Sequence, residues 1–149
     1  MPGCKELFRM PGKLMDYFNR SPRLGTLSTA SGDGKVDSAV FGSPRMTDEK
    51  TVVMGIGKGR SLANLQQNPH AVFLIMEPGT SLAEWKGVRV YLKMRTAETS
   101  GPRLDAYRAE IGKVIGADTA KKMIHAMVSF EVTELRPLVD MGQGWEKSI

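Results

Sequence analysis

The segment from residue 57 to residue 61 carries the side chains best suited to hold an anion. It reads Gly57-Lys58-Gly59-Arg60-Ser61 and separates a run of β-forming residues from a short run of helix formers. The start of a helix presents unpaired N–H groups and the positive end of the helix dipole, which both favour phosphate. Arg60 can bind two phosphate oxygens, Lys58 adds a mobile point charge, and Ser61 adds a hydroxyl. A solvated turn followed by a helix that Ser61 caps is the alternative interpretation.

Other site chemistries find little support in the sequence. The segment matches neither the Gly-x-x-x-x-Gly-Lys-Ser/Thr phosphate loop nor a dinucleotide fingerprint. His70, His125 and the single Cys4 lack the spacing of metal ligands, so no metal site is expected. The chain also has no Gly-x-Ser-x-Gly elbow, which argues against a hydrolase triad.

Charge favours an anionic ligand without identifying it. The chain carries a formal net charge of +5 and has a pI near 9.5. Such a balance attracts a phosphorylated cofactor, an acidic metabolite or nucleic acid. Because the Lys and Arg residues are scattered along the chain, nucleic-acid binding by a small basic barrel is the less favoured alternative.

Length and hydropathy predict one cytoplasmic domain. The 149 residues suit a single core, and we expect one domain over residues 1–149. The dense apolar run at 71–76 is far shorter than the ~20 residues of a membrane-spanning helix. No secretory signal is recognisable, and a lone cysteine agrees with a reducing compartment.

Hydrophobic patterning predicts a mainly β domain with flanking helices. We expect six strands, at 24–30, 35–43, 51–56, 71–76, 88–95 and 128–135, and read the polar stretch 44–50 as a turn. Three helical regions are expected, at 11–20, at 61–67 and over 102–127, the last with a break near Gly116. The first belongs to an N-terminal helical segment 1–20, and residues 137–149 form a tail. Short connections indicate an antiparallel-dominated barrel or sheet.

The order of several motifs resembles the FMN-binding split-barrel family related to pyridoxamine 5′-phosphate oxidase. These motifs are LGTLSTA at 24–30, DGKV at 33–36, SAVF at 38–41 and GRSLANLQQNPHAV at 59–72. WKGVRV at 85–90 and the closing strand at 128–135 look like the later barrel strands, so the resemblance covers roughly residues 10–140. It implies a six-stranded split β-barrel and a homodimer with two FMN sites at the subunit interface.

The resemblance also implies how the FMN phosphate is held. The family's helix after the third strand begins with Ser-Arg-Lys or a similar triplet, which maps onto Gly59, Arg60 and Ser61. Arg60 therefore inherits a phosphate role, whereas Ser61 replaces the usual lysine and Lys58 could compensate for it. The basic residue that the oxidases carry on the second strand has no counterpart at Ser38 or Ala39.

For the flavin ring, the resemblance implies contacts with the backbone of the second and third strands. The matching residues are Ser38, Val40, Phe41, Met54 and Gly55. A glycine within a strand is also a site where backbone or ligand comes close. Trp85 or Trp145 could cover the ring from the partner subunit, and a core position is the alternative for either tryptophan.

We therefore expect a homodimeric FMN-binding flavoprotein, an oxidoreductase that passes electrons or hydride between a nicotinamide such as NAD(P)H and a small acceptor. FMN performs such transfers itself, so no catalytic side chain is named. The tail at 141–147 lacks the basic motif that holds the substrate phosphate in true pyridoxamine phosphate oxidases, so that activity is not expected. A non-catalytic FMN-binding electron carrier or sensor is the alternative, and F420 or haem could replace FMN.

Overall fold

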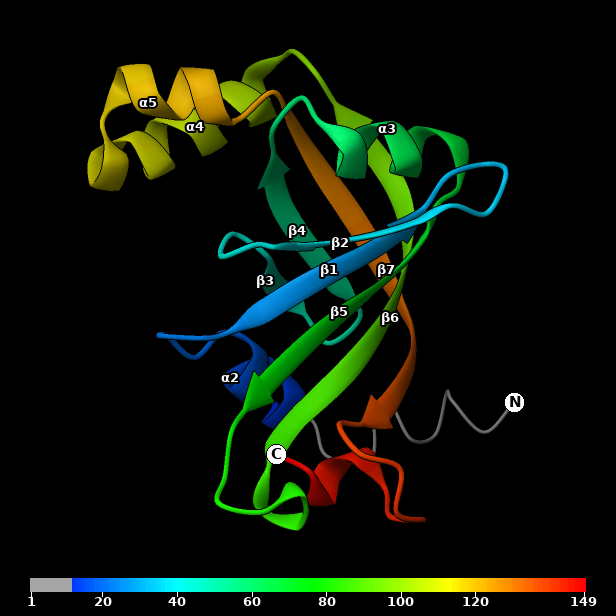
Figure 1. Cartoon of the computed structure of the whole chain (residues 1–149). Coiled ribbons are helices and arrows are strands. Elements are labelled where there is room, and N and C mark those ends of the chain that lie inside the picture. Colours follow the sequence, from blue (N-terminus) through cyan, green and yellow to red (C-terminus); the bar gives the residue numbers. More distant parts are fainter. Residues whose placement is uncertain (1–11) are drawn as a thin grey trace.

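A strongly curved antiparallel sheet forms the centre of the computed structural model, which describes residues 12–149 (Figure 1). Its strand order is β2-β1-β5-β6-β7-β4-β3, and every neighbouring pair is antiparallel. The strands are β1 (Gly25–Ala30), β2 (Val36–Val40), β3 (Arg45–Asp48), β4 (Thr51–Ile56), β5 (His70–Glu77), β6 (Lys86–Glu98) and β7 (Ala126–Pro137). The predicted antiparallel, mainly β arrangement is confirmed.

The expected number of strands is wrong, because the sheet has seven strands instead of six. The additional strand is β3, which lies in the polar stretch 44–50, where the sequence predicts a turn. It forms the edge of the sheet beside β4, and only Met46 among its residues is buried. Four residues with one buried side chain show too little alternation to be distinguished from a turn.

The two longest strands give the sheet its curvature. β6 has 13 residues and β7 has 12, and their pairing shifts register between Tyr91 and Leu92 and again between Met94 and Thr96. Such bulges bend a strand and increase its twist. The concave side holds the main core, to which Phe73, Val90 and Phe130 contribute fully buried side chains.

The helices lie at two ends of the curved sheet (Figure 1). Helix α2 (Lys13–Phe18) and the 3-10 helix η2 (Trp145–Lys147) lie at one end, whereas α3 (Arg60–Gln67), α4 (Pro102–Ile115) and α5 (Ala117–Met123) lie at the other. A third short helix, η1 (Leu82–Glu84), precedes β6. Helix α2 is shorter than the predicted 11–20, and residues 1–11 of the predicted N-terminal helical segment lie outside the described residues. Between residues 12 and 149, no helix has the length and apolarity needed to span a membrane.

Residues 102–127 divide as the sequence predicts. Gly116 separates α4 from α5 with a φ of +94°, a conformation that favours glycine. Leu104 and Ile124 are buried in a second, smaller core beneath this helical hairpin, together with Ala120 and Met127.

The C-terminal segment is part of the folded core. Trp145 is 2% exposed and belongs to the main core. Ser148 fastens the segment to the sheet, because its carbonyl accepts a hydrogen bond from Gly87 N (2.8 Å) and its Oγ accepts one from Leu138 N (3.1 Å). The alternative that Trp145 covers a flavin from the partner subunit is therefore wrong, because its side chain is enclosed within its own subunit.

Candidate cofactor-binding site

Helix α3 starts with an N-terminus that no side chain caps. Its N-cap is Gly59, in extended conformation, and Arg60 is the first helical residue. The first N–H groups of a helix have no partner within the helix. Ser61 is buried and lies inside the first turn, so the interpretation that it caps the helix is wrong. Lys58 and Arg60 are exposed, and neither forms an ion pair with any residue of the described range.

A groove runs between α3 and the turn that joins β1 to β2. Its volume is about 460 Å³, and its lining residues are Ser31, Asp33, Lys35, Val36, Arg60, Asn64 and Gln67. Lys35 is a second basic residue in the same groove as Arg60, and no local pattern marks it as a site residue. The resemblance implies a basic residue at the position of Ser38 or Ala39, within the strand, whereas Lys35 precedes β2. We call this cavity the α3 groove.

Hydrogen bonds hold the two walls of the α3 groove together. Gln67 Oε1 accepts a hydrogen bond from Gly32 N (2.9 Å), and Asn64 Nδ2 donates to Thr29 Oγ1 (3.0 Å). Within the turn, Ser31 N donates to the carbonyl of Lys35 (2.9 Å). Helix and turn therefore form one frame that positions the basic side chains.

Gly55 on β4 is enclosed by side chains from two other segments. Its N–H donates to Tyr107 Oη (2.9 Å), and its carbonyl accepts a hydrogen bond from Ser43 Oγ (2.9 Å). A Cβ at this position would lie 2.5 Å from the Tyr107 ring, so the close approach expected at Gly55 is made by Tyr107. Burial raises the pKa of Tyr107, which keeps its hydroxyl neutral. A flavin would have to displace these two hydroxyls to bond with Gly55.

The other residues expected near the ring are dispersed. Ser38 and Val40 are exposed on β2, and Phe41 is half-buried against the main core. Met54 has no exposed surface, so its side chain belongs to the core. Trp85 is half-buried and directly precedes β6, which starts at the end of the sheet opposite α3 (Figure 1).

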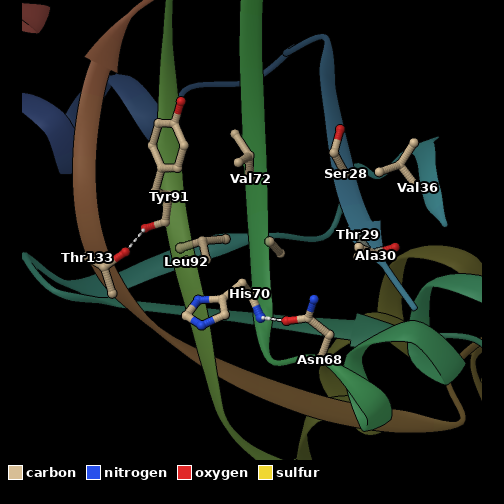
Figure 2. Close-up of a pocket in the computed structure, with 11 residues that line it drawn as sticks. Ser28, Thr29, Ala30, Val36, Asn68, His70, Val72, Tyr91, Leu92 and Thr133 are labelled. Carbon is tan, nitrogen blue, oxygen red and sulfur yellow. Dashed lines mark hydrogen bonds between the residues drawn. The ribbon is translucent and has the colours of Figure 1, made fainter. Parts of the chain in front are cut away.

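A second cavity lies on the outer face of the sheet. Figure 2 shows His70, Val72 and Tyr91 among the side chains that line its volume of about 260 Å³. Thr133 Oγ1 donates to the carbonyl of Tyr91 (3.3 Å), and most of the other lining groups are apolar. The same face exposes Val36 (83%) and Val40 (70%) on neighbouring β2. An apolar surface of this kind is typical of a binding or association surface.

Comparison with known families identifies the chain. The family model described as pyridoxamine 5′-phosphate oxidase matches residues 12–138. The chain belongs to this family. A search of curated proteins finds no match. The family assignment makes the antiparallel sheet a split barrel of the pyridoxamine 5′-phosphate oxidase type, with seven strands in this chain.

Solved structures agree with the fold. An FMN-binding protein from Syntrophomonas wolfei subsp. wolfei is similar with a TM-score of 0.71 and 19% identity, over 92% of this chain and 89% of its own. HutZ, described as a heme storage protein from Vibrio cholerae, has a TM-score of 0.62 and 16% identity over 83% and 92% of the two chains. An F420 reductase has a TM-score of 0.60 and 15% identity over 85% and 98%. At these identities the likeness establishes the fold alone, and the named cofactors differ among these proteins.

Proposed function

We propose that this protein binds FMN, with the phosphate at the N-terminus of α3, and uses it to transfer electrons or hydride to a small acceptor. The main observation is the uncapped first turn of α3, where Arg60 has no ion-pair partner among residues 12–149. This turn lies within the segment that the family model matches. When bound, FMN supplies the electron-transfer chemistry, and the protein binds and orients it.

The α3 groove supports a phosphate site because its walls supply complementary groups. The N–H groups of the first turn can donate to phosphate oxygens, and the Arg60 guanidinium can make two parallel hydrogen bonds. Lys35 in the same groove and the exposed Lys58 next to it in sequence raise the local positive potential.

We also propose that the protein is a homodimer that uses the outer face of the sheet. Val36 and Val40 leave most of their surface exposed there, beside the cavity of Figure 2. Covering them with a second copy would remove this apolar surface from water. Trp85 could then reach a flavin only across the subunit interface, because in its own subunit it lies at the end opposite α3.

Titration with FMN tests the phosphate role. The purified protein should show flavin absorption bands or take up added FMN. Arg60→Ala should weaken FMN binding by about 10- to 150-fold, equivalent to about 1.5–3 kcal/mol for a charge-assisted hydrogen bond. Arg103→Ala is the matched control, because Arg103 also lies in the first turn of a helix, α4, and is exposed. Unchanged affinity in Arg60→Ala would refute its role, and a protein that ignores FMN would refute the function.

Anaerobic mixing with NADH or NADPH separates an enzyme from an electron carrier. Loss of the flavin absorption would show that a nicotinamide reduces the protein, and candidate acceptors could then be tested by reoxidation. Reduction by neither nucleotide would favour the carrier or sensor. Nucleic-acid affinity that falls steeply with rising salt and does not depend on bound FMN would favour a nucleic-acid-binding barrel instead.

Haem is a second candidate because of the outer cavity. His70 on β5 and Tyr91 on β6 both line this cavity, and both residue types serve as axial ligands of haem iron (Figure 2). The similar HutZ is described as a heme storage protein. Adding haemin should then give an absorption band that His70→Ala removes, whereas Arg60→Ala should leave it unchanged. The affinity for F420 can be compared with the affinity for FMN by titrating the protein and its Arg60→Ala variant with each cofactor.

A further inference from the structure

The α3 groove extends well beyond the place of a single phosphate. Its helical wall runs from Arg60 through Asn64 to Gln67, which is about 10 Å along the axis of an α-helix. The volume of about 460 Å³ falls within the range of roughly 300–1,000 Å³ of pockets that hold small ligands. A phosphate on the first turn of α3 would occupy only the Arg60 end.

The rest of the groove carries three polar side chains suited to a further group. Lys35 forms no ion pair with the described part of the chain, although Asp33 lines the same groove. The Asp33 carboxylate accepts a hydrogen bond from Ser31 Oγ, which holds it at the turn. Gln67 uses its Oε1 to accept from Gly32 N (2.9 Å), and its Nε2 bonds to none of the residues from 12 to 149.

The turn that carries Asp33 and Lys35 is firmly built. Gly34 N donates to the carbonyl of Ser31 (3.0 Å), and Lys35 N donates to Ser31 Oγ (3.1 Å). Gly34 has a φ of +87°, which a residue with a side chain rarely adopts. The backbone that carries Lys35 and Asp33 is therefore fixed, which lowers the entropic cost of binding a ligand between the two side chains.

We propose that this end of the α3 groove binds the second phosphate and the ribose of a flavin dinucleotide. Lys35 pairs with the second phosphate, Asp33 accepts hydrogen bonds from ribose hydroxyls, and Gln67 Nε2 donates to the adenylate. Carboxylates take this ribose role in other dinucleotide sites. The inference rests on the proposed flavin site at Arg60, and it adds a cofactor class and a second subsite.

Affinities of the full-length protein for riboflavin, FMN and FAD, measured by quenching of flavin fluorescence, test this subsite. We expect FMN to bind more tightly than riboflavin, and FAD about 10-fold more tightly than FMN. Lys35→Gln should weaken FAD about 10-fold and FMN less than about twofold, the scale of one charge-assisted hydrogen bond. Asp33→Asn should weaken the binding of FAD and leave the binding of FMN unchanged. Lys86→Gln, at the opposite end of the sheet, is the control and should change neither affinity (Figure 1).

Each failure points to a different conclusion. If FMN binds more tightly than riboflavin but FAD gains nothing over FMN, the second subsite is refuted and the phosphate site stands. If Lys35→Gln weakens FMN and FAD equally, Lys35 holds the first phosphate and the second subsite is again refuted. If riboflavin, FMN and FAD bind equally or none binds, the proposed phosphate site fails, and the second subsite fails with it.

Discussion

The two ends of the curved sheet use arginine in opposite ways. At the end with α2 and η2, Arg23 donates to the carbonyls of Phe18 (2.5 Å), Gly42 (3.1 Å) and Pro44 (2.8 Å). Its guanidinium also lies over the Phe73 ring, 5.0 Å from the centroid. At the end with α3, the Arg60 side chain is exposed and makes no hydrogen bond with the described residues. At one end Arg23 stabilises the fold through its hydrogen bonds, and at the other end the Arg60 guanidinium is left free to bind a ligand.

Two further arginines at the end with α2 and η2 strengthen this contrast. Arg89 donates to the carbonyl of Pro137 (2.8 Å) and to Asp140 (2.6 Å), and Arg136 reaches the same carboxylate (3.0 Å). Trp145 at this end is buried in the main core. We call the end of the sheet with α2 and η2 the closed end, and the end with the α3 groove the binding end. Changes at the closed end should affect stability, and changes at the binding end should affect ligand affinity.

Trp145→Ala should have the largest effect. Removing a buried tryptophan from the main core leaves a cavity, and the free energy of unfolding should fall by about 3–5 kcal/mol. Urea unfolding of the apoprotein measures this loss. FMN affinity of the folded protein should stay unchanged. Lower affinity with unchanged stability would place Trp145 at the flavin and end the contrast between the two ends.

Arg23→Ala should have the next largest effect and lower the free energy of unfolding by about 2–3 kcal/mol. Burial lowers the pKa of Arg23, but the guanidinium remains charged, and its removal leaves carbonyl groups without a donor. Arg60→Ala is the counterpart at the binding end and should change apoprotein stability by less than about 0.5 kcal/mol. Urea unfolding and FMN titration of both variants measure these effects. Equal changes in stability and in FMN affinity for the two variants would contradict the contrast between the two ends.

Tyr107→Phe should cost about 1–2 kcal/mol, because it leaves the buried N–H of Gly55 without its acceptor. We expect FMN affinity to change less than about twofold. Tyr91→Phe is the control, since the Tyr91 hydroxyl bonds to none of the described residues. Tighter FMN binding in Tyr107→Phe would show that the flavin competes for Gly55, which would extend the binding end to β4.

The smallest effect concerns pH at the closed end. Burial, together with the hydrogen bond from Tyr17 Oη to Glu77 Oε2 (2.5 Å), raises the pKa of Tyr17 above its ordinary value of about 10. The unfolded chain therefore releases this proton first, so the contribution is complete below pH 10 and declines as pH rises further. Raising the pH from 8 to 10.5 lowers the free energy of unfolding of the wild type. In Tyr17→Phe this decrease should be smaller by about 0.8 kcal/mol. An unchanged loss would contradict the role of Tyr17.

Much of the fold follows from local sequence patterns. Asn68 and Pro69 end α3 because the residue before proline is displaced from helical conformation. Gly116 divides α4 from α5 for a similarly local reason, its positive φ. The exception is β3, whose pairing with β4 is visible only once the sheet is formed.

The amino-acid sequence by itself determined that a basic helix start follows a run of β-forming residues, because helix starts and strand alternation depend on nearest neighbours. Only the tertiary structure showed that no side chain caps this helix. Only the tertiary structure decided which other residues share that site. Lys35 reaches the α3 groove because the turn between β1 and β2 packs on the helix. Tyr107 meets Gly55 from 52 residues away. Such contacts depend on the order of strands and the curvature of the sheet, which no local pattern encodes.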